Sequence, residues 1–238
     1  MAAVDAFSTA TSLLAALRDG TIGAAELTEL YIRRIQRHDR ALNAVVVRDF
    51  TRAREQAVGA EHARGRGERP PLLGLPMTLK ESINVTGLHT TCGVPDWKAF
   101  ISQHDAPVAA RTRAAGAVLL GKTNVPPMLA DWQSANPVHG RTGNPWDLAR
   151  TPGGSSGGSA AAIAAGLSAL EVGSDIGGSI RVPAAFCGNY GHRPSETLLP
   201  KSGQFPMPPL PNSAVVMGVQ GPLTRSAEDL ELALSALA

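Results

Sequence analysis

The sequence has few of the features that mark secreted, membrane or nucleic-acid-binding proteins. It contains two cysteines, Cys92 and Cys187, which cannot form a disulfide framework and have no metal-type or redox-type partner in the sequence. No apolar run approaches the length of a membrane span, and the short run 13–17 follows Asp5 without the basic start of a signal peptide. The formal net charge of +2, without a long basic block, gives no sign of a nucleic-acid partner. We therefore expect a cytoplasmic protein that binds neither membrane nor nucleic acid directly.

Aromatic residues are also scarce, at 4% of the chain, while hydrophobic residues make up 43% and charged residues 18%. This balance is typical of a soluble globular protein, whose core must here be built mainly from Ala, Val, Leu and Ile. The six histidines show no paired spacing of the kind that metal sites use.

Up to about residue 65 the chain has the pattern of helices. Thr21 is expected to cap a helix whose apolar positions, from Leu27 to Ile35, follow helical spacing. A buried strand is expected at 42–47 and a solvated helix at 48–64.

From residue 72 onward, short apolar runs alternate with helical segments, which predicts an α/β fold built on a layered sheet. Strands are expected at 75–79, 117–120, 167–172 and 215–219, with helices at 105–115 and after Ser226, where Glu228 and Asp229 suit the helix dipole. No linker divides the chain, so residues 1–238 are expected to form one domain that includes the amino-terminal helical segment, residues 1–65.

The segment 151–194 carries the chemistry. It reads TPGGSSGGSAAAIAAGLSALEVGSDIGGSIRVPAAFCGNYGHRP: a Gly/Ser loop, an Ala-rich helix, a strand and a second Gly/Ser loop. Both loops place hydroxyl groups beside residues with almost no side chain, which suits a site where substrate approaches backbone N–H groups. Two flexible turns joined by a helix would not explain why Ser174, Asp175, Ser179 and Arg181 cluster at the second loop.

These motifs resemble the amidase signature family, and the resemblance covers essentially the whole chain. It extends to LGLPMTLKESINVTG (73–87), GKTNVP (121–126), NPWDLARTPGG (144–154) and GVQGPLTRSAEDLELAL (218–234). It implies a mixed sheet flanked by helices, and hydrolysis of a carboxylic amide to acid and ammonia or amine without cofactor or metal. Known members are considerably longer, so the resemblance implies an incomplete domain, truncated at its carboxy-terminal side. A second chain or a further segment would complete it, and exposed apolar surface on the unfinished side would favour self-association into a homo-oligomer.

The resemblance implies a catalytic triad of Ser179, Ser155 and Lys80. Ser179 is the nucleophile that forms the acyl-enzyme, Ser155 passes its proton to Lys80, and the Gly154–Ser155 peptide bond is cis. The chemistry is coherent, because lysine can act as a base once burial lowers its pKa from about 10.4 toward about 7–8. The structural alternative is a strand-end Lys80 paired with Glu81.

Other roles follow from the same resemblance. Backbone N–H groups of the second loop are expected to bind the oxyanion: those of Ile176, Gly177, Gly178 and Ser179. Ser174 is expected to hydrogen-bond the relay, Asp175 and Arg181 to hold the loop in shape, and Met128 to line the acyl pocket.

Two further segments match the letters of known motifs, but the elements expected around them argue against those functions. GAVLLGKT (116–123) fits the Walker A pattern, but its interior is a strand-forming run where a phosphate loop needs a flexible turn, and Lys122 is interpreted as structural. GSSGG (154–158) fits the nucleophile-elbow pattern with Ser156 as nucleophile, but no strand directly precedes it. His192 is interpreted as a loop histidine.

Three functions are open at this point. The favoured one is a free-standing amidohydrolase acting on a small carboxylic amide. The second is the amidase (glutaminase) subunit of a tRNA-dependent amidotransferase, which passes ammonia to a partner; LADWQSANPVHG (129–140) looks more like stand-alone amidases. The third is a truncated remnant without turnover. The sequence does not name the acyl group.

Overall fold

A six-stranded mixed sheet, in the order β1-β3-β2-β6-β8-β7, forms the centre of the computed structural model, which describes residues 4–206 and 217–238. Its middle strands β3 (Val118–Thr123), β2 (Pro76–Lys80) and β6 (Glu171–Asp175) run parallel. Antiparallel strands complete the sheet: β1 (Val45–Arg48), β8 (Val219–Thr224) and β7 (Tyr190–Gly191). Strands β4 (Ala135–Asn136) and β5 (Gly140–Arg141) form a separate antiparallel ribbon. The expected mixed sheet is confirmed.

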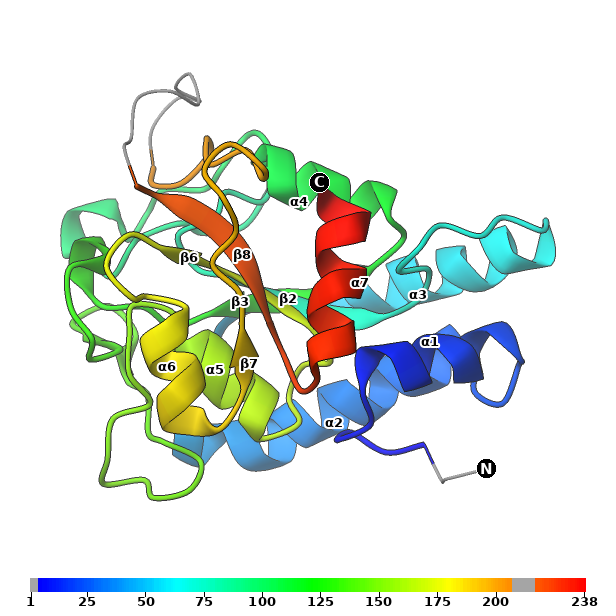
Figure 1. Cartoon of the computed structure of the whole chain (residues 1–238), viewed down its shortest axis with the longest axis horizontal. Coiled ribbons are helices and arrows are strands. Elements are labelled where there is room, and N and C mark those ends of the chain that lie inside the picture. Colours follow the sequence, from blue (N-terminus) through cyan, green and yellow to red (C-terminus); the bar gives the residue numbers. More distant parts are fainter. Residues whose placement is uncertain (1–3, 207–216) are drawn as a thin grey trace.

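Helices pack around this sheet (Figure 1). Their bounds are α1 Ala10–Arg18, α2 Ala24–Leu42, α3 Phe50–Gly65, α4 Pro107–Ala114, α5 Gly157–Ala164, α6 Arg181–Cys187 and α7 Ala227–Leu237, with short 3-10 helices at Pro95–Trp97 and Pro127–Leu129. Helix α5 contacts β2, β3, β6 and β8, while α7 packs on β8 and β7 and contacts α1 and α4. Helix α3 packs on β3 and α2.

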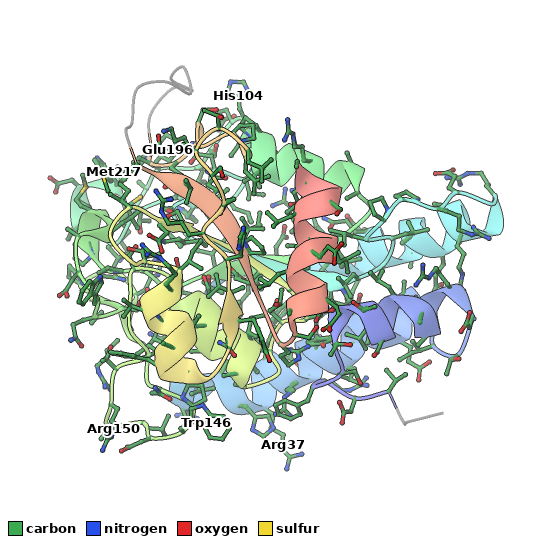
Figure 2. All side chains as sticks on the ribbon, in the orientation of Figure 1. Arg37, His104, Trp146, Arg150, Glu196 and Met217 are labelled. Atoms are coloured by element: carbon green, nitrogen blue, oxygen red, sulfur yellow. The ribbon has the colours of Figure 1, made fainter. Side chains whose placement is uncertain are left out.

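Small aliphatic side chains fill the core, as the scarcity of aromatics predicts. Leu, Val, Ile and Ala dominate the buried set, and Tyr31 is its one aromatic member among the described residues. Charged side chains such as those of Arg37, Arg150 and Glu196 project outward (Figure 2). No helix of the described residues is long and apolar enough to cross a membrane.

Three expected boundaries are wrong, two of them for identifiable reasons. The cap of α2 is Gly23, not Thr21, because the N–H of Thr21 donates to Ala16 O at the end of α1. The expected strand 167–172 lies at 171–175, because the N–H of Leu167 still closes the end of α5. The strand expected at 215–219 overlaps β8 only at Val219, where β8 begins. Positions 215 and 216 lie outside the described residues.

The last helix begins as expected, with Ser226 Oγ accepting from the N–H of Asp229 at 3.1 Å. The Asp229 carboxylate, however, accepts from the N–H groups of Ala10 and Thr11 at 2.9 and 2.8 Å, so it caps α1 rather than its own helix. Strand β1 pairs with β3, which places the amino-terminal helical segment on the same sheet.

Candidate active site

The parallel strands bring three polar residues to one edge of the sheet. Lys80, Thr123 and Asp175 are the last residues of β2, β3 and β6. Because adjacent parallel strands end at the same edge, residues far apart in the sequence meet there, which is the usual place for a site in such sheets.

Lys80 is completely buried and makes no ion pair with any described residue. Its Nζ donates to Ser155 Oγ at 2.7 Å, to Ser174 Oγ at 3.0 Å and to Ser174 O at 3.4 Å. Burial lowers the pKa of Lys80 to about 7, against smaller raising effects of Cys92, Asp175 and Glu171. Lys80 is therefore largely unprotonated at mildly alkaline pH and can accept a proton.

Ser155 occupies the turn that leads into α5. The Gly154–Ser155 peptide bond is cis, as the resemblance implies. The next residue, Ser156, is fully buried, and its hydroxyl contacts the backbone O and N of Ser174, each at 3.3 Å. Ser156 is thus occupied in joining α5 to β6, whereas Ser155 points to the lysine.

Ser179 lies beside these serines. The N–H of Ser156 donates to Ser179 O at 3.1 Å, which joins the first Gly/Ser loop to the second. No hydrogen bond between Ser179 Oγ and Ser155 Oγ is formed in the described structure, so the expected contact of Ser155 with both partners exists only on the Lys80 side. Catalytic hydrogen bonds are often long or misaligned without substrate, and rotation about the Ser179 side-chain bond changes this distance directly.

Asp175 organises the nucleophile loop. Its carboxylate accepts from the N–H groups of Gly178 at 2.8 Å and Ile180 at 3.0 Å, and Arg181 binds both carboxylate oxygens at 2.9 and 3.0 Å. Burial alone would raise the pKa of Asp175, but the Arg181 guanidinium and these N–H groups lower it to about 2. The expected loop-holding role of Asp175 and Arg181 agrees with this geometry.

The same contacts alter the expected oxyanion hole. The N–H of Gly178 is taken up by Asp175, contrary to the expectation for this residue. The N–H groups of Ile176, Gly177 and Ser179 donate to no acceptor in the described structure, and a Cβ at Gly177 would meet no atom within 4 Å. The open side of the loop therefore lies at Ile176 and Gly177, and an oxyanion there is a prediction.

We expect Asp175→Asn to destabilise the fold by roughly 2–3 kcal/mol at neutral pH, because hydrogen bonds to a buried charged group are lost. A carboxylate with a lowered pKa stabilises the folded state above its unfolded pKa, and this stabilisation is lost as pH falls from about 4 toward about 2. Urea unfolding at pH 7 and pH 3 should show the difference between wild type and variant shrinking in acid. A constant difference would contradict the assigned role of the charge.

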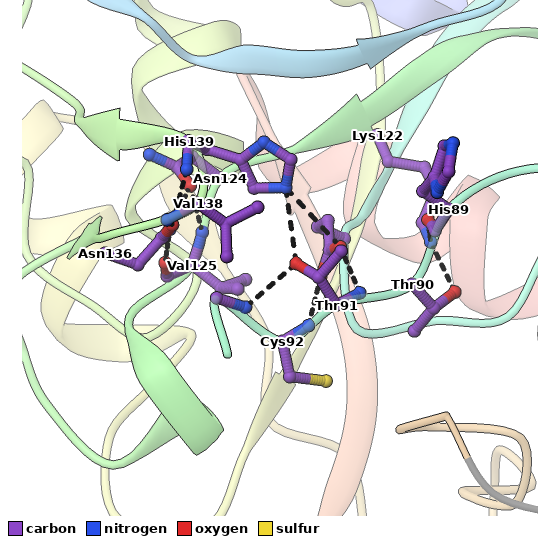
Figure 3. A network of polar contacts seen from close by, with 12 residues as sticks. His89, Thr90, Thr91, Cys92, Lys122, Asn124, Val125, Asn136, Val138 and His139 are labelled. Carbon is purple, nitrogen blue, oxygen red and sulfur yellow. Dashed lines mark hydrogen bonds and ion pairs between the residues drawn. The ribbon is translucent and has the colours of Figure 1, made fainter. Parts of the chain in front are cut away.

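A second fully buried lysine, Lys122, lies in β3 near the site. Its Nζ donates to His89 O and to Thr90 Oγ1, the latter at 2.7 Å, and burial lowers its pKa to about 8 (Figure 3). Residues 118–123 form a strand rather than a phosphate loop, so the structural interpretation of Lys122 is supported and the Walker A match is not.

The Glu81 carboxylate is turned away from Lys80 and toward the following loop. It accepts from the N–H groups of Thr91 and Cys92, and His139 Nε2 lies 3.7 Å away. Cys92 O in turn accepts from the N–H of Met128 at 2.9 Å. Glu81 therefore fixes the loop against which Met128 is held, and the alternative of a Lys80–Glu81 pair is not supported.

The other expected residues lie at the periphery. Met128 is half exposed and has a φ of 54°, and its role in an acyl pocket stays a prediction. His192 lies in the loop after β7, as expected. The sequence reasoning missed Trp132, whose indole would lie 3.8 Å from a Cβ at Gly178 and is half exposed next to the nucleophile loop. No group of three or more metal-ligating side chains occurs among the described residues.

Comparison with known proteins gives consistent matches. A family model described as Amidase matches residues 26–238. The putative amidase AmiB2 of Mycobacterium tuberculosis is 43% identical over 231 residues, which are 97% of this chain and 48% of the relative. A glutamyl-tRNA(Gln) amidotransferase subunit of Thioalkalivibrio sulfidiphilus is 41% identical over 94% of this chain and 45% of its own length.

Among solved structures, 6-aminohexanoate cyclic dimer hydrolase in complex with substrate superposes with a TM-score of 0.88 at 35% identity, covering 98% of this chain and 47% of that one. The chain thus spans about half the length of the relatives it matches.

Proposed function

Because this chain belongs to the amidase signature family, we propose that it cleaves a carboxylic amide through an acyl-enzyme on Ser179. The observation that carries the proposal is the buried Lys80, which has no ion-pair partner among the described residues and holds its Nζ 2.7 Å from Ser155 Oγ. A neutral amine in this place is a base, and the residue after Ser155 bonds the nucleophile loop through its N–H to Ser179 O.

In the proposed reaction, Ser179 Oγ forms a bond to the amide carbonyl carbon while its proton passes to Ser155 and the Ser155 proton passes to Lys80. The C–N bond then breaks as the same chain of groups returns a proton to the departing amine or ammonia. Water repeats the attack on the acyl-enzyme and releases the acid. The N–H groups of Ile176, Gly177 and Ser179 are proposed to bind the oxyanion, where one donor is worth about 3–4 kcal/mol.

A fluorophosphonate probe tests the nucleophile. We expect mass spectrometry of the labelled chain to place the phosphonyl group on Ser179, with no labelling in Ser179→Ala and retained labelling in Ser156→Ala. Ser156 is the matched control, because its buried hydroxyl already contacts the Ser174 backbone. A label on Ser156 would show that the nucleophile-elbow interpretation is correct and ours is not.

For the substrate we propose a small linear carboxylic amide acted on in the cytoplasm. The related solved structure is named as the hydrolase of a cyclic dimer, so linear and cyclic amides should be compared directly.

A second candidate function rests on the identity to a glutamyl-tRNA(Gln) amidotransferase subunit. Under this reading the chain would release ammonia from glutamine and pass it to a partner. Glutaminase activity that requires added partner proteins would mark this function, and a chain that no amide or probe acylates would mark an inactive remnant.

A further inference from the structure

The buried carboxyl group of Glu171 has no part in the proposed reaction, yet it lies at the centre of a cluster of hydroxyl groups. It is completely buried at the start of β6, opposite Thr78 of β2. One carboxyl oxygen bonds Thr78 Oγ1, and the other bonds Thr123 Oγ1 and Ser159 Oγ, each at 3.0 Å. Thr123 and Ser159 also bond each other, at 2.8 Å.

These contacts join the elements that carry the relay. Thr78 lies two residues before Lys80 on β2, so both side chains are on the face of the sheet that α5 covers. Ser159 lies in the first turn of α5, four residues after Ser155. Glu171 therefore bonds both β2, the strand of Lys80, and α5, the helix that follows Ser155. The 2.7 Å contact between Lys80 and Ser155 depends on the distance between this strand and this helix.

The number of hydrogen atoms available in the cluster indicates whether the Glu171 carboxyl group is protonated. Apart from a long contact of Thr123 Oγ1 with Leu79 O at 3.4 Å, the cluster contains four contacts: Thr78 with Glu171, Thr123 with Glu171, Ser159 with Glu171, and Thr123 with Ser159. The three hydroxyl groups supply three hydrogens, one fewer than the contacts need. A protonated carboxyl supplies the fourth: Glu171 donates to Thr123, Thr123 to Ser159, Ser159 back to Glu171, and Thr78 to the other oxygen.

We propose that Glu171 is a positioning residue of the relay, which holds β2 and α5 together as a neutral carboxylic acid. This rests on the proposed function of Lys80 and Ser155. Neutrality matters because a buried anion next to Lys80 would favour the protonated lysine and so remove the base. Lys80 is the titratable group that faces the cluster from β2. Strand β3 and helix α5 present the hydroxyls of Thr123 and Ser159, and β8 presents Leu223 in register with Glu171.

The surroundings agree with a neutral acid. Burial raises the pKa of Glu171 to about 8, and the three hydroxyl groups and Lys80 oppose this only in part. At neutral pH the carboxyl group is therefore mostly protonated, while Lys80 has already begun to lose its proton.

Two substitutions separate positioning from charge. Glu171→Gln keeps the size, neutrality and hydrogen-bonding capacity, so fluorophosphonate labelling of Ser179 at pH 7 should proceed within about threefold of the wild-type rate, with the same rise in rate up to about pH 8. Glu171→Leu removes the bridge between Thr78 and Ser159, and labelling should slow by at least about 30-fold. Val172→Ala is the matched control: it opens a cavity on the opposite face of the same strand and should leave the labelling rate nearly unchanged.

Infrared spectroscopy of the full chain tests the protonation state without any need for activity. At pH 7, the wild type minus Glu171→Gln difference spectrum should contain a protonated carboxyl C=O band that is lost above about pH 9. An absent band, or a Glu171→Gln rate as low as that of Glu171→Leu, would overturn the proposal. If the wild-type chain is not labelled at all, the proposed function fails, while the carboxyl band still decides whether Glu171 is the neutral acid inferred here.

Discussion

Lys80→Met is expected to lower amide turnover, or Ser179 labelling, by about 10³–10⁴-fold while the fold is retained. Methionine fills most of the volume of the buried lysine side chain, so the loss reports the missing base rather than a cavity. The change removes the Nζ that bonds Ser155 and Ser174, so the proton of Ser179 has no acceptor at the end of the relay. Initial rates at saturating substrate, with circular dichroism as a check on folding, measure the effect.

The pH dependence gives the same prediction a second readout. Only unprotonated Lys80 is a base, and a pKa of about 7 leaves roughly a tenth of it unprotonated at pH 6 and roughly nine tenths at pH 8. The wild-type rate should therefore rise about tenfold per pH unit below pH 6, more slowly between pH 6 and pH 8, and fall again at higher pH, where ionised Glu171 favours the protonated lysine. Lys122→Met is the matched control, since it removes the other fully buried lysine and should leave this rise in place. A rate that is flat from pH 5 to pH 9 with chemistry rate-limiting would contradict a lysine base.

Much of the fold follows from local patterns in the sequence. The apolar spacing from Leu27 to Ile35 predicts α2, and Ser226 predicts the start of α7, because each signal lies within the element that it specifies. The errors occur where a neighbouring element decides. Thr21 is held by the end of α1, and Asp229 accepts from the N–H of Ala10, 219 positions away in the chain, which no local pattern can reveal.

The site divides in the same way. Lys80, Ser155 and Ser174 are where the motifs predict, because the residues of each motif are fixed by one strand or loop. The N–H of Gly178 donates to Asp175 because of the backbone direction in the loop that carries Ser179, and the sequence GSDIGGS (173–179) does not specify that direction. Glu171 has no signal of its own in the sequence: an acidic residue in an apolar run gains its meaning only when β2, β3 and α5 bring three hydroxyl groups to it.

Ser155→Ala is expected to lower turnover by at least about 100-fold, the range for losing general acid–base assistance, with little change in substrate binding. The Ser155 hydroxyl accepts a hydrogen bond from Lys80 Nζ, and Lys80 makes no bond to Ser179 in the described structure. Alanine leaves the lysine in place but removes the group through which a proton from Ser179 can reach it. A simple Ser179–Lys80 dyad would have no need of this hydroxyl, so a mild effect would show that the proton takes another route.

Ser156→Ala supplies the comparison, because it removes a neighbouring buried hydroxyl of the same size. Among the described residues that hydroxyl forms hydrogen bonds only with the Ser174 backbone, so its loss should cost about 1 kcal/mol of stability and leave the chemical step intact. A structure of the phosphonate-labelled chain should then show Ser155 Oγ between Ser179 and Lys80. In the free chain only the hydrogen bond between Ser155 and Lys80 is formed. If both alanine variants lose activity equally, the loop as a whole is being disturbed, and the bridging role of Ser155 would have to be given up.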